Sequence, residues 1–267
     1  MSQRDPEEIW EEGLDEGERR LTRDVKGLSA SGFAGGAEVA FGILAVMVVT
    51  GAAAEVAPEG TAHVIGSLVF GIAFVLITVG RAELFTENFH IPVGAVYAKR
   101  APLWALGRMW VVTLLFNIVG LLLFLWLLSV DGVLEPATVE AAGKAATTYA
   151  ERDTIAALAS AVVAGTVITV FTWAIAAAES ASTRVMLSLL VGFLLVAPSL
   201  NHAVVAFGKI LFGILLDSGT ASVGELWRNL GLATAGNLVG GVGIVFLTRL
   251  AQVRGEPGGA GSGKRPG

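Results

Sequence analysis

Long apolar stretches alternate with short polar ones along almost the whole chain. Six of them are long enough for a membrane-spanning helix, which needs about 20 mostly apolar residues. These stretches lie at about residues 33–54, 63–98, 103–130, 154–178, 185–216 and 226–250. The pattern predicts an all-α polytopic membrane protein with six transmembrane helices, a short loop at 55–62 and a polar connector at 131–152.

Two of these stretches, 65–98 and 185–216, are too long for one crossing, and polar residues interrupt each of them midway. The first interruption runs from Gly80 to His90, and the second from Pro198 to His202. Irregular backbone at membrane depth is tolerated only where it is buried in protein or lines a water-filled cavity. We therefore expect two broken helices, with the functional site where the breaks meet.

Residues 1–30 have a different character from the apolar stretches. They are charged, but Trp10 and Leu14 recur at helical spacing, and Asp5 followed by Pro6 is typical of a helix start. We expect an amphipathic helix that lies along the membrane or a neighbouring subunit. Because this segment lacks the apolar core of a signal peptide, the N-terminus is expected to stay in the cytoplasm.

Composition supports membrane embedding of residues 31–252. Hydrophobic residues make up 54% of the chain and charged residues 15%, whereas an ordinary soluble domain has about 25% charged residues. The absence of cysteine excludes disulfides, thiolate metal sites and cysteine nucleophiles. No basic face indicates a nucleic-acid partner, and the Gly- and Pro-rich residues 253–267 are expected to form a disordered tail.

Lysine and arginine predict the orientation, because cytoplasmic loops carry an excess of them. Six crossings that start inside place both chain ends in the cytoplasm. The basic residues then expected on the cytoplasmic side are Arg19, Arg20, Arg23, Lys26, Lys99, Arg100, Arg108, Arg184, Arg249 and Arg254. Those expected outside are Lys144, Arg152 and Arg228. The bias predicts a multi-pass protein of the inner (plasma) membrane with both termini cytoplasmic.

Two short segments recur between the halves of the chain. Ser67 to Gly71 is matched by Ser188 to Gly192, and Asn117 to Gly120 is matched by Asn237 to Gly240, at nearly the same offset. Each half holds three expected crossings, so the second half would be inserted upside down relative to the first. This predicts an inverted 3+3 repeat, in which broken helices at equivalent places point to a permeation site near the midplane.

Three motifs in this order resemble the formate/nitrite transporter family. They are Glu83-Leu84-Phe85-Thr86 in the first break, Asn117-Ile118-Val119-Gly120, and Asn201-His202-Ala203-Val204 after the second break. The resemblance covers roughly residues 28–250. It implies an aquaporin-like protomer in a homopentamer, embedded in the lipid bilayer. Each protomer would have its own pore for a small monovalent anion, such as formate, nitrite or hydrosulfide, and a proton, with no cofactor or metal.

Four residues depart from the family pattern. Asn201 stands where members commonly carry Glu, and Ala206 stands where a polar Asn is usual. Arg81 in the first break and Lys209 in the second half-helix are also unusual. These departures bear more on the identity of the substrate than on the fold, and they indicate a divergent branch of the family.

His202 is the leading candidate for the central chemistry. A buried histidine more often has a structural role with its hydrogen bonds satisfied, but the position of His202 in a helix break favours a functional role. Its ordinary pKa near 6.5 suits proton exchange at neutral pH. We expect it to neutralise or hydrogen-bond the anion. Thr86 is the expected partner, with a hydroxyl that can select one imidazole tautomer; the alternative for Thr86 is a loop cap.

The resemblance also implies two apolar constrictions. Phe74 and Leu84 would form the cytoplasmic one, and Phe70 and Leu195 the outer one. Phe70 and Phe74 are four positions apart and therefore share one helix face. The alternative for each is ordinary helix packing.

Several charged residues lie within or near the expected spans. Lys209 follows His202 by two helical turns, about 10 Å along the axis, and would either attract anions or extend to the lipid headgroups. Arg81 would either contact the substrate or pair with Glu38 or Glu83 to hold the loop.

The other polar residues have simpler interpretations. We interpret His63 and His90 as structural or interfacial residues. Asn117 and Asn237, beside small residues, are interpreted as helix-packing groups.

An anion pore has three alternatives. An enzyme is not expected, because the sequence has no HExxH or Gly-x-Ser-x-Gly motif and no aspartate pair inside the spans. A pore for neutral solutes would need paired Asn-Pro-Ala motifs, which are absent. A transport-inactive scaffold, with Arg81 and Lys209 blocking the pore, is the remaining alternative.

Overall fold

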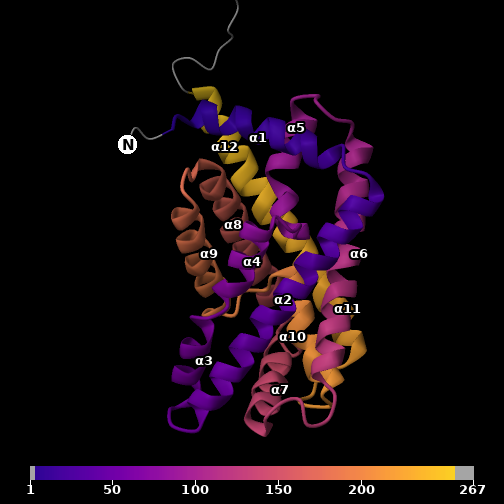
Figure 1. The fold of residues 1–267 in the computed structure, drawn as a ribbon, viewed down its shortest axis with the longest axis vertical. Helices are drawn as coiled ribbons and strands as arrows, with labels where there is room; N and C mark the ends of the chain where they lie inside the picture. The colour runs from indigo at the N-terminus through magenta and orange to yellow at the C-terminus, as the bar shows by residue number, and fades with distance from the viewer. Residues whose placement is uncertain (1–3, 256–267) are drawn as a thin grey trace, which may run out of the picture.

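The computed structural model describes residues 4–255, and all regular structure in this range is helical (Figure 1). The elements in chain order are α1 (Pro6–Leu21), α2 (Val25–Ala54), α3 (Glu59–Ser67), α4 (Gly71–Gly80), η1 (Phe85–Phe89), α5 (Ile91–Tyr97), α6 (Leu103–Leu128), α7 (Pro136–Ala150), α8 (Thr154–Ala177), α9 (Ala181–Val196), α10 (Ala203–Leu215), α11 (Val223–Leu238), η2 (Val239–Phe246) and α12 (Leu247–Gly255). Of these, η1 is a 3-10 helix and η2 is a π-helix. The expected disordered tail lies almost wholly outside the described residues.

Five helical stretches are long and apolar enough to cross a membrane. They are Val25–Ala54, Glu59–Gly80, Leu103–Leu128, Thr154–Ala177 and Val223–Gly255. The shorter apolar helices α9 and α10 make up the two parts of the second broken stretch. The prediction of an all-α polytopic membrane protein is confirmed, whereas the number of crossings and the inverted repeat stay predictions.

Both helix interruptions fall on the polar patches that the sequence marks. In the first, α4 ends at Gly80 and α5 begins at Ile91; in the second, α9 ends at Val196 and α10 begins at Ala203. Arg81 ends α4 in the left-handed conformation, with φ of 58°. This conformation is uncommon for a residue other than glycine and turns the chain sharply out of the helix.

The boundary between the N-terminal segment and the first span differs from the prediction. α1 ends at Leu21, and α2 begins at Val25 rather than near residue 33. The reason is a cap: the Asp24 carboxylate accepts a hydrogen bond of 2.7 Å from the backbone N–H of Gly27, which satisfies one of the free donors of the first turn. Residues 25–30 therefore belong to the first long helix.

The polar connector predicted at 131–152 is wrong, because much of it forms α7. Proline at the first turn starts this helix. Ala142, Ala146 and Tyr149 form its buried face, and the helix packs against α10 and α2. Alanine and threonine gave this stretch too little hydropathy contrast to reveal the buried face. Similarly, α3 begins at Glu59, inside the loop expected at 55–62.

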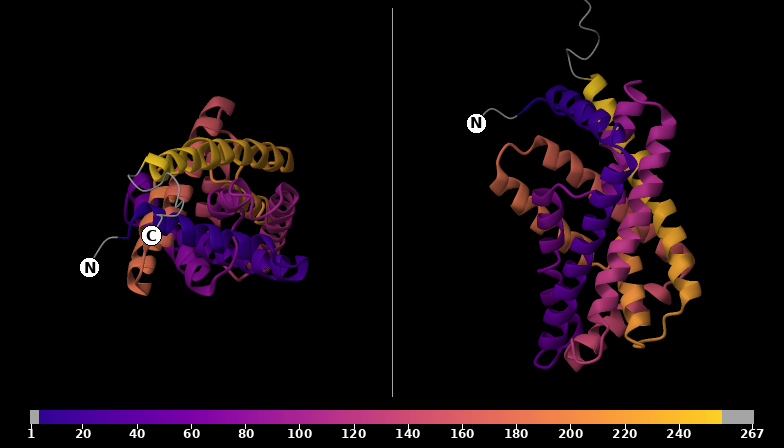
Figure 2. Two further views of the ribbon diagram at one scale, coloured as in Figure 1. Left: turned by 90° about the horizontal axis from the view of Figure 1, so that it is seen from above. Right: turned by 45° about the vertical axis from the view of Figure 1, so that its right-hand side comes forward.

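The broken helices lie between two ends of the molecule (Figures 1 and 2). α1 and α5 occupy one end, and α3 and α7 occupy the other. Between them α4 packs against α9 at Gly71 and Gly192, where a Cβ atom on Gly192 would overlap the backbone of Gly71. This backbone contact brings the first and second halves of the chain together near the middle of the molecule.

Candidate functional site

The two breaks meet at a hydrogen bond between Thr86 and His202. Thr86 lies in η1, and His202 is the N-cap residue of α10. The Oγ1 atom of Thr86 lies 2.6 Å from the Nε2 atom of His202, and both side chains are fully buried. The structure thus joins the two residues that the sequence singled out as partners.

The hydrogen bonds of His202 assign its tautomer. The backbone N–H of Val205 donates to Nδ1 at 3.3 Å, so Nδ1 acts as an acceptor and the neutral ring carries its proton on Nε2. Nε2–H then donates to Thr86 Oγ1, which leaves the hydroxyl proton of Thr86 free for another acceptor. A second proton on Nδ1 would face the Val205 N–H, so this arrangement favours a neutral imidazole.

Asn117 of α6 holds the first break in place. Its Oδ1 accepts a hydrogen bond of 2.9 Å from the backbone N–H of Phe85, and its Nδ2 donates to the carbonyls of Gly32 at 2.7 Å and Glu83 at 2.9 Å. Unpaired backbone groups at membrane depth cost several kcal/mol each. The carboxamide therefore supplies partners that the interrupted helix lacks.

Asn237 does the same for the second break. Its Oδ1 accepts a hydrogen bond of 2.9 Å from the backbone N–H of Ala203, and its Nδ2 donates to the carbonyls of Ala161 at 2.8 Å and Asn201 at 3.1 Å. The sequence identified both asparagines only as packing groups, because their acceptors belong to distant segments.

Asn201 is fully engaged within the protein. Its side chain exchanges two hydrogen bonds with Asn229, of 3.1 and 3.0 Å, and also donates to the carbonyl of Ala157 at 3.2 Å. These bonds leave its carboxamide little capacity to contact a solute. Its place in the site is therefore to fix the break next to His202.

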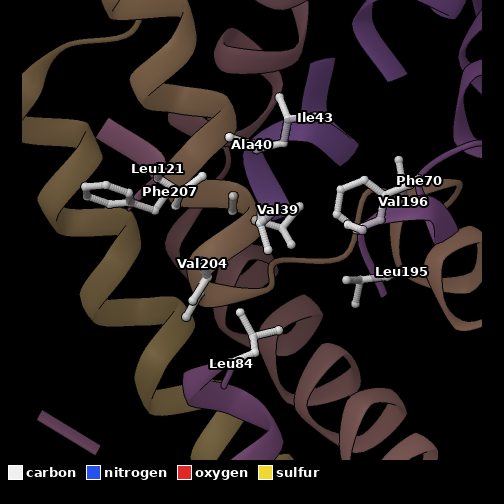
Figure 3. Close-up of a cluster of buried hydrophobic side chains, with 14 of the residues drawn as sticks. Val39, Ala40, Ile43, Phe70, Leu84, Leu121, Leu195, Val196, Val204 and Phe207 are labelled. Atoms are coloured by element: carbon white, nitrogen blue, oxygen red, sulfur yellow. The ribbon is translucent and has the colours of Figure 1, made fainter. Parts of the chain in front are cut away.

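The four residues expected to form constrictions are all buried apolar side chains in one large cluster, part of which is shown in Figure 3. The rings of Phe70 and Phe74 lie edge to face with centroids 5.8 Å apart. Phe74 contacts Phe171 of α8 in the same way, at 5.6 Å. Leu84 and Leu195 belong to the same cluster. The centre of the molecule is therefore packed with hydrocarbon around the Thr86–His202 pair.

Two cavities lie at opposite ends of the molecule. The α1 cavity, of about 490 Å³, is lined by α1 together with Arg81, Glu83 and Glu87. The α7 cavity, of about 550 Å³, is lined by residues of α2, α3 and α7 and by Lys209. Among the residues that the structure describes, neither Thr86 nor His202 lines either cavity. The polar pair therefore occupies a closed region between two open ones.

Glu83 has different partners from those predicted. Its carboxylate accepts from Arg23 at 2.8 Å and from Arg20 at 3.4 Å, so it joins the first break to the N-terminal segment. Within residues 4–255 neither Glu83 nor Glu38 forms an ion pair with Arg81. The predicted loop-holding pair is therefore wrong, because Arg20 and Arg23 approach the loop from another element.

Lys209 does not extend to the lipid headgroups, contrary to one of its two predicted interpretations. It is only 2% exposed, and its Nζ atom lies 5.3 Å from the centre of the Tyr149 ring. Because α7 covers this part of α10, the amine faces the protein interior and the α7 cavity. Because the sequence did not reveal α7, it could not decide whether the Lys209 amine faces the lipid headgroups or the protein interior.

The two other histidines lie away from the central pair. His63 Nε2 lies 3.1 Å from the carbonyl of Ala197. His90 is buried among the rings of Trp10, Trp173 and Phe246, with centroid separations of 5.3 to 6.1 Å. Neither ring nitrogen of His90 has a hydrogen-bond partner among the described residues, and the structural or interfacial role expected for both histidines stays a prediction.

The formate/nitrite transporter family model matches residues 7–251. The chain belongs to this family. It is therefore a multi-pass membrane protein of a transporter family.

Individual proteins of known sequence are moderately similar to this chain. A protein from Methanothermobacter thermautotrophicus named "Probable formate transporter" is 32% identical over 231 residues, which cover 78% of this chain and 82% of the relative. "Inner membrane protein YfdC" from Escherichia coli (strain K12) is 28% identical over 253 residues, which cover 93% of this chain and 79% of the relative.

Solved structures of the family share the fold. A structure titled "FNT family ion channel" superposes with a TM-score of 0.81 at 17% identity and covers 92% of this chain and 98% of its own. Another, titled "Pentameric formate channel with formate bound", has a TM-score of 0.70 at 18% identity and covers 85% and 97%. This agreement confirms the channel-like protomer fold.

In this member of the formate/nitrite transporter family, the sequence analysis missed one titratable residue, Glu87. It follows Thr86 directly, lines the α1 cavity and is buried, and its Oε1 atom lacks a hydrogen-bond partner among the described residues. An acidic residue inside an apolar stretch was the available signal. No cluster of three metal-ligating side chains occurs in the described range.

Proposed function

We propose that the protein is a membrane channel or transporter for small monovalent anions of weak acids, in the class of formate, nitrite and hydrosulfide. Family membership and the relative named a probable formate transporter support this class. The observation that carries the proposal is the Thr86–His202 hydrogen bond of 2.6 Å in the closed region between the two cavities. This bond supplies a polar point at the middle of an otherwise apolar route.

The apolar centre favours passage of the solute in its neutral form. An unpaired ion in a dry constriction faces an idealised penalty of tens of kcal/mol. Protonating a weak acid with a pKa of roughly 3.5 at pH 7 costs about 5 kcal/mol, at 1.36 kcal/mol per pH unit. Neutralisation is therefore the cheaper way through the slit formed by Leu84, Phe74, Phe70 and Leu195.

The tautomer of His202 limits what this residue contributes. A neutral imidazole that donates Nε2–H to Thr86 has no proton to give up without becoming an anion. The Thr86 hydroxyl, whose own proton is free, is the group that hydrogen-bonds the solute, and His202 orients and polarises it. In this mechanism the neutralising proton comes from the bulk solution as hydronium, through the water of a cavity, rather than from His202.

Arg81 has a separate role at the entrance. Its exposed guanidinium lines the α1 cavity and forms no ion pair with the carboxylates of the described residues. Arg20 and Arg23 line the same cavity but are paired with Glu83. Arg81 therefore raises the local concentration of anions by long-range attraction.

The oligomeric state of the protein and its orientation in the membrane are also part of the proposal. We propose a homopentamer with a pore in each protomer, since a related structure is titled a pentameric channel. Large apolar side chains remain exposed on the outer faces of the protomer, including Trp126 and Leu194, and lipid or a neighbouring protomer would cover them. The excess of basic residues at the α1 end supports a cytoplasmic location for both termini. Native mass spectrometry of the detergent-solubilised protein tests the pentamer.

The central experiment measures uptake of labelled formate and nitrite into proteoliposomes. His202→Phe removes both hydrogen bonds and is expected to reduce uptake at least tenfold. His202→Asn can still accept from the Val205 N–H and donate toward Thr86, so it should retain more uptake than His202→Phe. His90→Phe is the matched control, because it changes a buried histidine among aromatic rings away from the pair.

The outcomes separate the alternatives. Equal uptake by the wild type and His202→Phe would rule out a role for the central pair. Absence of uptake in the folded wild type would favour the transport-inactive scaffold. Uptake of neutral solutes such as glycerol, without uptake of formate or nitrite, would instead indicate an aquaporin-like pore.

A further inference from the structure

Lys209 is a buried cation without a counter-charge. Its side chain is 2% exposed, and no carboxylate of residues 4–255 lies within ion-pair distance of its amine. Burying an ammonium group costs several kcal/mol unless it is paired. The amine opens onto the α7 cavity of about 550 Å³. The protein thus places an unpaired amine, which is positive when protonated, beside a space large enough to hold a small solute.

The surroundings of Lys209 strengthen the positive potential. Tyr149 contacts two cations: the Nζ atom of Lys209 at 5.3 Å from its ring centre and the guanidinium of Arg152 at 5.2 Å. Arg152 donates to Ser199 and Ser160, and it forms no ion pair with a described carboxylate. The negative face of the ring partly stabilises both cations, but it cannot replace a full negative charge.

Two hydroxyl groups of the cavity wall are also unpartnered. The Tyr149 and Thr50 hydroxyl oxygens are buried and have no hydrogen-bond partner within the described residues. Buried polar groups in proteins are nearly always hydrogen-bonded, so such exceptions require an explanation. Both residues line the cavity, and each hydroxyl can donate to an acceptor that a rotation of its side chain brings within reach.

We propose that Lys209, Tyr149 and Thr50 form an anion-binding subsite in the α7 cavity, for a small monovalent anion such as formate or nitrite. The subsite rests on the proposed function and deepens it, because it gives the anion a holding place before the closed centre. It lies two turns of α10 from His202, about 10 Å along the helix axis. Lys209 therefore attracts the solute and does not block its path.

The distribution of charge restricts the ligand to monovalent anions. One unpaired ammonium compensates one negative charge. Three exposed carboxylates also line the cavity: Glu55, Glu59 and Glu140. These groups repel a dianion more strongly than a monoanion. Sulfate should consequently compete poorly for the subsite, whereas nitrite should displace formate.

The test measures equilibrium binding rather than transport. The full-length protein in lipid nanodiscs is titrated with 13C-formate, and binding is followed by the line width of the formate resonance. Lys209→Met keeps the length and volume of the side chain and is expected to weaken binding at least tenfold. Tyr149→Phe keeps the ring over both cations and loses only the hydroxyl, so we expect a loss of about threefold to fivefold.

Lys144→Met provides the matched control. Lys144 lines the same cavity, but it is exposed and paired with Glu140 at 2.9 Å, so its replacement should leave formate binding unchanged. Unchanged binding in Lys209→Met, or equal losses in the two lysine variants, would overturn the subsite. If Lys209→Met does not fold, unchanged binding in both Tyr149→Phe and Thr50→Val would overturn it.

Uptake assays on the same variants in proteoliposomes separate this inference from the proposed function. Formate uptake by the wild type, combined with binding that does not depend on Lys209, would refute the subsite alone. Binding that depends on Lys209, combined with a wild type that takes up neither formate nor nitrite, would refute the transport function and leave the anion site.

Discussion

Asn117 and Asn237 make equivalent sets of three hydrogen bonds, one set at each helix break. Each Oδ1 accepts from the backbone N–H of the first residue of a helix, Phe85 of η1 or Ala203 of α10, and each Nδ2 donates to two carbonyls. The backbone around Thr86 and His202 is therefore held by side chains of other helices. Such support keeps irregular chain segments stable where water cannot reach them.

Asn117→Ala should strongly destabilise the protein. The change leaves the backbone N–H of Phe85 and the carbonyl of Glu83 without partners, at about 1–3 kcal/mol for each buried group, whereas the carbonyl of Gly32 keeps its bond within α2. We expect a total loss of at least about 2 kcal/mol, seen as a lower thermal unfolding temperature in detergent.

Thr113→Val is the control for Asn117→Ala. Thr113 lies one turn earlier on α6, and its buried hydroxyl lacks a hydrogen-bond partner among the described residues. Its loss should therefore have little effect. A similar change in unfolding temperature for the two variants would show that the carboxamide does not support the break.

Thr86→Val should lower formate uptake about tenfold, whereas Thr86→Ser should keep most of it. Valine has nearly the shape of threonine but leaves the buried Nε2–H of His202 without an acceptor, which costs about 1–3 kcal/mol. Initial rates in proteoliposomes measure the difference. Comparable rates for the valine and serine variants would exclude the hydroxyl from the mechanism.

The stabilisation of α1 by Glu16, which pairs with Arg19 and Arg20 of the same helix, should be independent of pH near neutrality. Burial alone would raise the pKa of Glu16, but hydrogen bonds from Arg19 and Arg20 outweigh it and lower the pKa to about 2. Because the folded pKa is below the unfolded value of about 4.3, the stabilisation is complete above that value. It is lost as the pH falls toward 2.

Hydrogen exchange of α1 checks this prediction. The difference in protection between the wild type and Glu16→Gln should be constant from pH 5 to 8 and decrease only below about pH 4.5. Glu18→Gln, a change at an exposed residue of the same helix, should behave like the wild type. A change in the Glu16 effect between pH 6 and 7 would contradict the assignment.

Gly192→Ala should prevent normal packing of α9 on α4. The new methyl group would overlap the backbone of Gly71, which cannot move aside like a flexible side chain, and overpacking of this kind costs about 1–3 kcal/mol. Gly231→Ala on α11 meets open space and should stabilise the helix by about 0.5–1 kcal/mol. Thermal unfolding of the two variants should therefore shift in opposite directions.

Sequence was sufficient to place the two breaks, because Arg81 and Glu83 in the first and Pro198 in the second stand out within long apolar stretches. The same contrast identified Thr86 and His202. It could not reveal α7, whose alanines separate a buried from an exposed face too weakly. It also could not pair Glu83 with Arg23, since the two residues lie 60 positions apart on separate elements.

The hydrogen bond between Thr86 and His202 joins residues 116 positions apart, and this distance affects how the protein is made. Because chains are synthesised from the N-terminus, the first break enters the membrane well before its partner exists. The centre of the molecule closes only when the second half has been inserted. A half-made chain therefore lacks the hydrogen bond that joins the two breaks.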